Sequence, residues 1–448
     1  MNPRRIFKAA WAALALAVFV PQLAWAVDVQ TLAARKGENI WYVEDHSLPM
    51  IAMSATLPAG SAYDPADKAG LAAFAALLLD EGAGNMNSTA FHAALSNRAI
   101  RLSVSPGRDY VTISLVTLSS NAKEAFRLLG LALAQPRFDG DAVARVRAQM
   151  LAALQQSDQD PESVAARGFF SDFFHGHPYG HPVSGNASSL AAISPADLKA
   201  FARTHWVRGD VKIAVSGDVN AAMLKALLAS AFGKLPATTP TPASFARQTG
   251  TPGVHVIPMP VPQPNIVFGL PGLVRSDRDF IPAYVANYIL GGGGFSSRLM
   301  NDVREKRGLT YGISTSLEPY RRAGLFVGQV ATKKTSVGET IKVVRQTMKT
   351  FVDQGPTDKE LADAKTYLTG SFPLAFDSNV GIAAQLNAFQ AAGLPVDYVE
   401  NRNALINAVT LEDVKRVSRR LFSPARLTVV VAGSPSAPAA KRTAVPAH

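Results

Sequence analysis

The chain has 448 residues, of which 48% are apolar and 18% are charged, and it contains no cysteine. This composition is typical of globular proteins and excludes a wholly disordered chain, while the length predicts two or three domains. The lack of cysteine excludes a disulfide scaffold, a cysteine nucleophile, a thiolate metal site and a lipoprotein anchor. The formal net charge is +11, but the basic residues form no long block, which argues against a nucleic-acid partner.

Residues 1–26 have the three-part pattern of a bacterial-type secretory signal peptide. Arg4, Arg5 and Lys8 precede an apolar run at 9–20, and a small-x-small site ends at Ala26. The run has 12 residues, which is short of the roughly 20 that a membrane-spanning helix needs. We therefore expect export, cleavage after Ala26 and a periplasmic protein without stable membrane insertion.

The remaining chain repeats one order of elements. Apolar stretches predict strands at 50–57, 100–104 and 110–116, and helical periodicity predicts helices at 69–79, 122–134 and 141–156. The second half repeats them, with strands at 265–270, 311–317 and 324–330 and helices at 281–290, 337–351 and 358–368. Pro49 and Pro264 are 215 positions apart, and Val143 and Leu361 are 218 apart. A nearly constant offset across several elements indicates a duplicated domain.

The predicted fold is α+β, with two homologous domains at 27–235 and 254–433, each a mostly antiparallel sheet with helices packed on one face. Residues 236–253 are rich in Thr, Pro, Ala and Gly and are interpreted as a linker. Residues 434–448 are rich in small residues and proline, which predicts a disordered tail.

Most catalytic motifs are missing from the sequence. It has neither Gly-x-Ser-x-Gly nor His-Glu-x-x-His, and the glycines at 291–294 are not followed by the Gly-Lys-Ser/Thr of a phosphate loop. His175, His177 and His181 form a cluster whose imidazoles could bind zinc. Prolines and a glycine between them prevent a shared helical face, so the alternative is a turn that contains ordinary histidines, either at the surface or in support of neighbouring residues.

Four segments together resemble the inverted-zincin peptidases, which include pitrilysin, insulinase and the mitochondrial processing peptidase. They span nearly all of the predicted mature chain. The segments are Gly70-Leu71-Ala72, the stretch 176–185 (Gly-His-Pro-Tyr-Gly-His-Pro-Val-Ser-Gly), Asp197-Leu198 with Gly217-Asp218-Val219, and Arg304-Glu305-Lys306-Arg307-Gly308-Leu309-Thr310-Tyr311 preceded by 292–299. The resemblance implies that the two domains form half of a clamshell chamber.

The sequence departs from that family at the metal site. The family binds zinc through His-x-x-Glu-His, whose glutamate is the general base. The matching positions here are Ala73, Ala76 and Leu77, and Ala152 and Ala153 stand where a further glutamate ligand is expected. None of these side chains can coordinate a metal or move a proton, so we expect no metal site and no cofactor in this chain.

The resemblance also implies that one half of the family's chamber contributes an arginine and a tyrosine to the zinc site of the other half. The matching residues are Arg304, expected on a helix, and Tyr311, expected on the next strand, with Gly308 as the turn between them. A guanidinium and a phenol donate hydrogen bonds that stabilise the oxyanion formed when the activated water attacks a peptide carbonyl. A surface ion pair for Arg304 and a core position for Tyr311 are the structural alternatives.

The leading hypothesis is a non-zinc subunit of a heteromeric zinc-dependent peptidase. It would donate Arg304, Tyr311 and half of a peptide-binding chamber to a homologous, zinc-bearing sister, and its substrates would be peptides or unfolded polypeptides. A catalytically inert scaffold or peptide-binding module of the same fold is the alternative. A metalloenzyme that uses His175, His177 and His181 is the third hypothesis.

Overall fold

A computed structural model describes residues 28–32, 39–242, 244–248 and 250–434 of the protein. The predicted signal peptide, and all of the predicted tail except Ser434, lie outside the described residues. Within the described ranges, no helix is both long enough and apolar enough to cross a bilayer.

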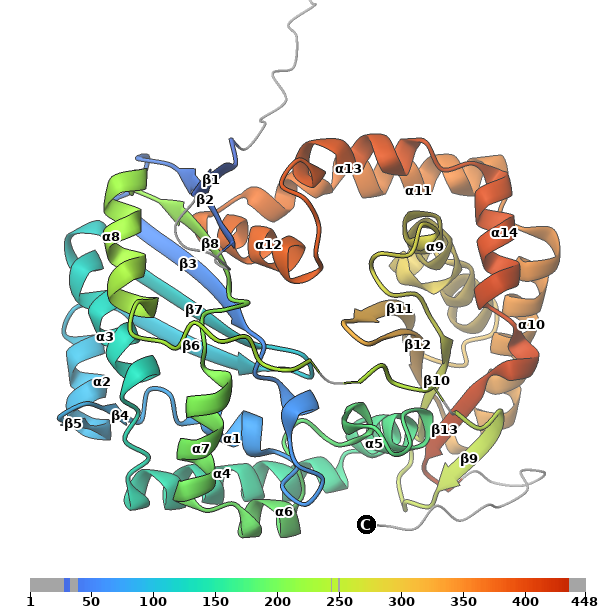
Figure 1. Ribbon diagram of the computed structural model, residues 1–448. Coiled ribbons are helices and arrows are strands. Elements are labelled where there is room, and N and C mark those ends of the chain that lie inside the picture. Colours follow the sequence, from blue (N-terminus) through green and yellow to red (C-terminus); the bar gives the residue numbers. More distant parts are fainter. Residues whose placement is uncertain (1–27, 33–38, 243, 249, 435–448) are drawn as a thin grey trace, which may run out of the picture.

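The first half of the chain builds a six-stranded sheet in the order β1-β2-β8-β3-β7-β6, on the left in Figure 1. Its strands are β1 Gln30–Leu32, β2 Asn39–Glu44, β3 Met50–Leu57, β6 Arg101–Pro106, β7 Val111–Leu118 and β8 Lys212–Gly217; a separate pair consists of β4 Gly82–Ala83 and β5 Met86–Asn87. Its helices are α1 Leu71–Leu77, α2 Ser88–Ser96, α3 Ala122–Ala134, α4 Gly140–Gln159, α5 Pro161–Phe173, α6 Ala187–Ala192, α7 Pro195–His205 and α8 Ala221–Phe232.

The second half builds a five-stranded sheet in the order β11-β12-β10-β13-β9, on the right in Figure 1. Its strands are β9 Gly253–Ile257, β10 Asn265–Pro271, β11 Ile313–Tyr320, β12 Ala323–Ala331 and β13 Thr428–Ala432. Its helices are α9 Phe280–Asn287, α10 Val337–Gln354, α11 Asp358–Gly370, α12 Asn379–Ala391, α13 Tyr398–Asn407 and α14 Leu411–Leu421. The described residues of 236–252 contain no helix or strand.

The two sheets share one topology, which confirms the predicted α+β fold with two homologous domains. In the first, β2 pairs parallel with β8, and β8, β3, β7 and β6 then pair antiparallel in turn. In the second, β9 pairs parallel with β13, and β13, β10, β12 and β11 pair antiparallel. Apart from β1, which adds a sixth strand beside β2 in the first sheet, the order and the sense of pairing match strand for strand.

Two predicted helices differ from those in the structure. The helix expected at 69–79 is only α1, because Gly70 has a left-handed φ of 93° that starts the helix late, and Leu78 leaves helical geometry. The helix expected at 281–290 divides into α9 and a π-helical turn at Tyr288–Gly292. The π-helical turn ends within the four glycines at 291–294.

Each domain's own helices cover one face of its sheet, and a helix from the other domain covers the second face. Helix α12 crosses from the second domain and packs on β8, β3 and β2 of the first sheet (Figure 1). The contact combines an apolar cluster with buried hydrogen bonds: the Ser216 hydroxyl donates to the Asn379 side chain at 2.7 Å, and the Ser54 hydroxyl donates to Asn387 at 3.2 Å. This covering explains why nearly all of β3 is buried.

Helix α5 makes the reciprocal contact. It belongs to the first half but packs on β10 and β13 of the second sheet. Phe169 and Phe173 stack at 5.1 Å between ring centroids and join the apolar cluster that contains Val267 and Val430. The domains therefore bury two helices against each other, and neither sheet is fully covered without the other domain.

A polar junction closes the contact between the two domains. The β6–β7 turn carries Asp109 and the β11–β12 turn carries Arg321 and Arg322, and Tyr179 lies between them. The Tyr179 hydroxyl donates to the Asp109 carboxylate, which also accepts a hydrogen bond from the Arg321 backbone N–H at 2.8 Å. The Arg322 N–H donates to the Tyr179 oxygen at 3.1 Å, and Arg321 pairs with Asp210 at 2.8 Å.

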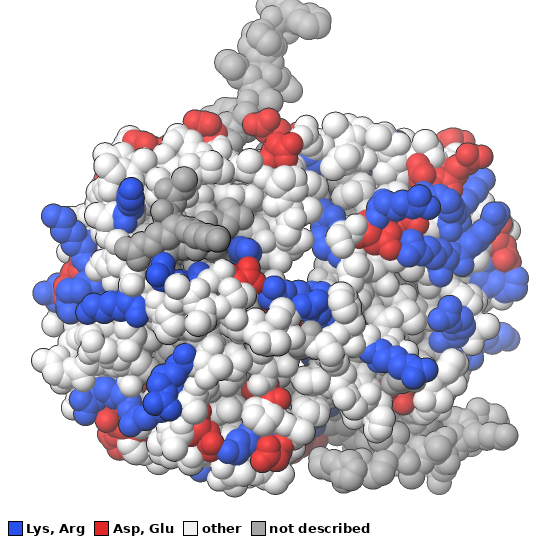
Figure 2. All heavy atoms as spheres, in the orientation of Figure 1, with Lys and Arg blue, Asp and Glu red and all other residues white. Residues whose placement is uncertain are grey.

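Charged side chains form small groups over the surface. Figure 2 shows Lys and Arg on both halves of this face, interleaved with acidic side chains at the right. On α14, Arg416 pairs with Asp279 and Asp413, and Arg420 pairs with Asp277 and Asp279. Much of the positive charge of this helix is therefore neutralised within the fold.

The junction generates a stability prediction. Tyr179 has an exposed fraction of 0%, so Tyr179→Phe leaves Asp109 short of one donor and the Arg322 N–H without its acceptor. We expect a loss of about 1–3 kcal/mol in the free energy of unfolding, the usual cost of an unsatisfied buried group, measured by urea unfolding. The control Tyr367→Phe alters a tyrosine that is 59% exposed and should leave the unfolding midpoint nearly unchanged. Equal midpoints for the two variants would contradict the role of the junction.

Candidate functional site

The segment that matches the family's metal helix is part of the hydrophobic core. Ala73 and Ala76 lie on α1 and are 1% exposed, packed among buried side chains of the first domain. Leu77 ends α1 and is partly exposed. Ala152 and Ala153 lie on the exposed side of α4. Because alanine and leucine side chains offer no donor atom, these positions do not fit zinc.

Glycines bring two of the four resembling segments together. Gly70 and Gly185 have φ values of +93° and +70°, which L side chains rarely adopt. A Cβ on Gly185 would lie 2.2 Å from the Ala69 carbonyl oxygen, and a Cβ on Gly70 would lie 2.8 Å from the Ser184 oxygen. The stretch 176–185 therefore packs directly against the start of α1, and the motif has a structural role here.

The buried carboxylate of Asp64 holds the start of α1. Its two oxygens accept hydrogen bonds from the backbone N–H groups of Gly70 and Ala72, both at 2.8 Å. These donors are among those that a helix leaves unsatisfied at its N-terminus. Burial raises the pKa of Asp64 to about 7, and the two backbone hydrogen bonds oppose that rise.

The structure does not assemble the three clustered histidines into a metal site. His177 is buried, and both of its ring nitrogens are occupied: Nε2 lies 3.1 Å from the Ser244 carbonyl oxygen and Nδ1 accepts from the Tyr179 N–H. His175 is exposed, and burial lowers the pKa of His181. These contacts agree with the alternative interpretation, in which the segment is a turn that contains ordinary histidines.

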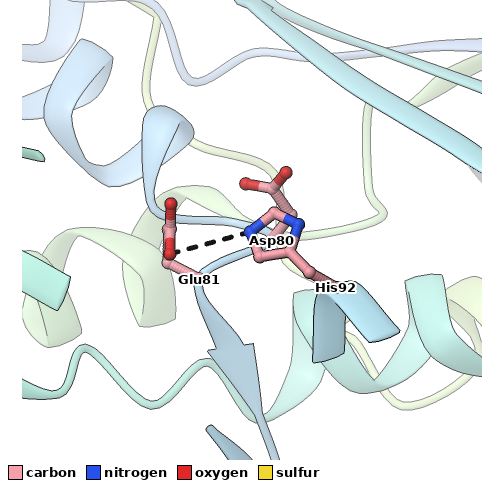
Figure 3. Close-up of side chains that lie close together, drawn as sticks. All are labelled: Asp80, Glu81 and His92. Atoms are coloured by element: carbon pink, nitrogen blue, oxygen red, sulfur yellow. Dashed lines mark ion pairs between the residues drawn. The ribbon is translucent and has the colours of Figure 1, made fainter. Parts of the chain in front are cut away.

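Another group of potential ligands lies near the end of α1. Asp80, Glu81 and His92 approach one another, with His92 Nε2 3.8 Å from Glu81 (Figure 3). Arg145 holds both carboxylate oxygens of Glu81 and the Ser88 hydroxyl donates to Glu81 as well. These contacts lower the pKa of Glu81. The carboxylate is neutralised by Arg145, so the cluster is explained as an ion-pair site that ties α4 to the β4–β5 segment.

Arg304 lies on a π-helical turn at Met300–Glu305, in which the Lys306 N–H reaches the Asn301 carbonyl at 2.9 Å. Single π-helical turns are frequent at functional sites. The Arg304 guanidinium pairs with Glu305 and lies 4.6 Å from the ring centroid of Phe295. Lys306 and Arg307, the other cations of this motif, fold back onto Asp302.

Gly308 ends this turn, as predicted. Its φ is +61°, its N–H donates to the Arg304 carbonyl at 2.8 Å, and the Leu309 N–H donates to the Val303 carbonyl at 3.0 Å. The Gly308 bond is the single 5→1 hydrogen bond of a left-handed glycine C-cap, and the Leu309 bond closes a wider turn around it. The cap reverses the chain immediately after Arg304 and directs the following loop along the same surface.

Tyr311 does not lie on a strand, contrary to the prediction, because β11 begins at Ile313. The buried Thr310 fixes a turn instead: its hydroxyl oxygen lies 2.7 Å from the Ala331 carbonyl and accepts from the Gly312 N–H at 3.1 Å. Thr332 donates to the Leu309 carbonyl at 2.6 Å. The backbone on both sides of Tyr311 is therefore held to β12, while the tyrosine side chain is 87% exposed.

Arg304 and Tyr311 line the same cavity, of about 320 Å³. The neighbouring part of its wall comes from Gln263, which precedes β10, and from Thr332 and Lys333, which follow β12. The prediction that Gly308 brings Arg304 and Tyr311 to one site agrees with this geometry. Gln263 and Lys333 belong to other segments, so the motif around Arg304 does not point to them, although the Lys333-Lys334 pair is visible in the sequence.

Comparisons with known proteins agree with this architecture. A model described as "Insulinase (Peptidase family M16)" matches residues 40–187, and one described as "Peptidase M16 inactive domain" matches residues 192–368. The crystal structure of a peptidase M16 inactive domain from Pseudomonas fluorescens superposes with a TM-score of 0.85 and 30% sequence identity, covering 93% of this chain and 99% of that one. The chain belongs to peptidase family M16.

Two relatives show the range of M16 proteins that this chain resembles. The "Non-peptidase homolog YmxG" of Helicobacter pylori is 27% identical over 405 residues, which cover 90% of this chain and 93% of that relative. The "Mitochondrial-processing peptidase subunit beta" of Blastocladiella emersonii is 23% identical over 387 residues, covering 84% and 82% respectively. The similarity to the Helicobacter relative therefore extends over nearly the whole length of both chains.

The Asp64 contact in this M16 chain predicts a pH-dependent stability. The folded pKa of about 7 exceeds the ordinary 3.8, so the folded chain retains a proton that the unfolded chain has lost. The stabilising contribution of protonated Asp64 is complete below about pH 4 and is lost as the pH rises through about 7. Between pH 5 and 8, the wild type should lose roughly 2–3 kcal/mol relative to Asp64→Asn, measured by urea unfolding at each pH.

The difference in unfolding free energy between the wild type and Asp64→Asn excludes the contributions of all other groups that titrate alike in both proteins. Asp67→Asn is the matched control because Asp67 lies on the same loop and is exposed. Its unfolding free energy should follow that of the wild type at every pH. Parallel curves for the wild type and Asp64→Asn would show that Asp64 is ionised throughout this range, contrary to the prediction.

Proposed function

We propose that this chain is the non-zinc subunit of a heteromeric zinc-dependent peptidase. It donates Arg304 and Tyr311, together with half of a peptide-binding chamber, to a homologous sister subunit that holds the metal. The observation that carries this proposal is the shared cavity: Arg304 and Tyr311 line it together, whereas Ala73, Ala76 and Leu77 offer no ligand. The chain thus keeps the donors of such a site and lacks its metal-binding part.

The geometry of the cavity allows Arg304 and Tyr311 to donate hydrogen bonds to a substrate that is not part of this chain. Tyr311 is 87% exposed, yet the hydrogen bonds of Thr310 and Thr332 fix the backbone of its loop. Such a side chain can meet a partner's substrate without a large loss of backbone entropy. The planar guanidinium of Arg304 presents several N–H donors, of which Glu305 engages one nitrogen.

In the assembled enzyme, zinc in the sister subunit would supply the activated water. This chain's own residues would act on the peptide carbonyl oxygen, on which negative charge grows during attack. The Arg304 guanidinium and the Tyr311 hydroxyl would donate hydrogen bonds to that oxygen, and removing one donor of this kind typically raises the barrier by about 2.7–4 kcal/mol. Neither residue needs to gain or lose a proton in this role.

Peptide binding and export complete the proposal. Strands β6 and β11 lie at the edges of their sheets, and an extended peptide can pair with such an edge through its backbone, largely independently of sequence. The pattern of residues 1–26 supports export and a periplasmic location. The name of the Blastocladiella relative, a subunit of a processing peptidase, supports assembly with a second M16 chain.

A second candidate function is an inert scaffold or peptide-binding module of the same fold. The name of the Helicobacter relative, a non-peptidase homolog, favours it. The two functions differ in one measurable property. A scaffold leaves the turnover of the sister subunit independent of Arg304, whereas a donor subunit does not.

The test is reconstitution with a zinc-bearing M16 chain from the same source. Arg304→Ala should lower kcat for peptide hydrolysis by about 100-fold or more, with a smaller change in KM, because the donor acts mainly on the transition state. Arg307→Ala is the matched control, since Arg307 belongs to the same motif but donates to the Asp302 carbonyl. Equal turnover with wild-type and Arg304→Ala chains would refute the donor role and favour the scaffold.

A further inference from the structure

The cavity beside Arg304 has a second cation that the proposed chemistry does not use. Lys333 contributes to its wall, together with Gln263 and Tyr311, whose side chains carry an amide and a hydroxyl. The carboxylate in this wall belongs to Glu305, and Arg304 already pairs with it. Two cations therefore share the cavity with one carboxylate, which leaves a site of net positive charge.

Lys333 is available to an outside group. The ion pairs found among the described residues do not include Lys333, and its side chain is exposed. Its backbone, by contrast, is fixed on both sides: the preceding Thr332 N–H donates to the Pro264 carbonyl at 3.1 Å, and the Lys333 carbonyl accepts from the Ser336 N–H at 2.8 Å. The ammonium is thus presented from a rigid strand end.

The size of the cavity limits what it can hold. A volume of about 320 Å³ corresponds to roughly ten water molecules at about 30 Å³ each. This space accepts one or two residues of a peptide and excludes a folded domain. A lysine ammonium, an amide N–H₂ and a phenol are all hydrogen-bond donors, and together they suit an anionic acceptor of small size.

We propose that this cavity binds a carboxylate of the peptide and that Lys333 determines this preference. The proposal rests on the proposed function, because it assumes that a peptide enters the cavity, and it adds the chemical class of that peptide. Arg304 and Tyr311 act at the carbonyl that reacts, and Lys333 holds a carboxylate farther along the same peptide. The carboxylate comes either from the carboxyl end of the peptide or from an aspartate or glutamate side chain.

Binding to the full chain alone tests the proposal. One fluorescent peptide ends in a free carboxylate and contains one glutamate; its variants carry a carboxyl-terminal amide, a glutamine in place of the glutamate, or both changes. Fluorescence anisotropy at low salt gives the Kd of each. Lys333→Gln should weaken binding of the doubly acidic peptide about fivefold, as expected for one partly exposed ion pair, and should leave the neutral peptide unchanged.

Lys334→Gln is the matched control. Lys334 is the neighbouring lysine, is also exposed and does not line the cavity, so its variant should bind all peptides as the wild type does. The single peptide change that abolishes the effect of Lys333→Gln identifies the source of the carboxylate. If all four peptides bind alike, or if Lys333→Gln and Lys334→Gln weaken binding equally, the proposal is wrong.

These outcomes are independent of the sister subunit. Loss of the Lys333 effect with an intact Arg304 effect on turnover would refute the carboxylate preference and leave the donor role in place. The reverse result would refute the donor role and retain a peptide-binding site with a preference for acidic peptides.

Discussion

The exchange of helices between the two domains is the constraint on which the rest of the structure depends. Each sheet has one face covered by its own helices and the other by a helix of its partner domain, α12 on the first sheet and α5 on the second. Burial of this apolar surface is the main stabilising contribution, and the buried hydrogen bonds of Asn379 and Asn387 fix the register of one contact. The β6–β7 and β11–β12 turns meet at Asp109 and Tyr179 as a consequence.

This constraint separates the roles of the motifs that resemble M16 peptidases. Gly70, Gly185 and Tyr179 serve packing: the glycines allow two backbones to approach closely, and the tyrosine fills the junction between domains. Such residues are needed whether or not a metal is bound. With Ala73 and Ala76 in place of ligands, α1 is an ordinary core helix.

Local periodicity predicts the strands and helices that repeat between the two halves, but not the remaining elements, among them β2, β8, β9, β13 and the helices α12 to α14. The strand β3 and the helix α3 have the bounds expected from their patterns, and the repeated order of elements predicts the shared topology. The helices α5 and α12 are not among the predicted elements, and their exchange is a long-range property, because a helical pattern does not show on which sheet the helix packs. Tyr311 was placed on a strand because apolar residues follow it, whereas the hydrogen bonds of Thr310 start the strand later.

The candidate site shows the same division between local and distant signals. Arg304, Gly308 and Tyr311 are neighbours in sequence, so one motif is sufficient to find them. Lys333 reaches the cavity only because β11 and β12 pair along their lengths, which brings the end of β12 beside the loop that precedes β11. The positions of both cations are set by backbone hydrogen bonds within the second domain, at a distance in sequence from the degenerate metal helix. The positively charged surface at Arg304 and Lys333 in the second domain therefore does not depend on which side chains stand at Ala73, Ala76 and Leu77 in the first domain.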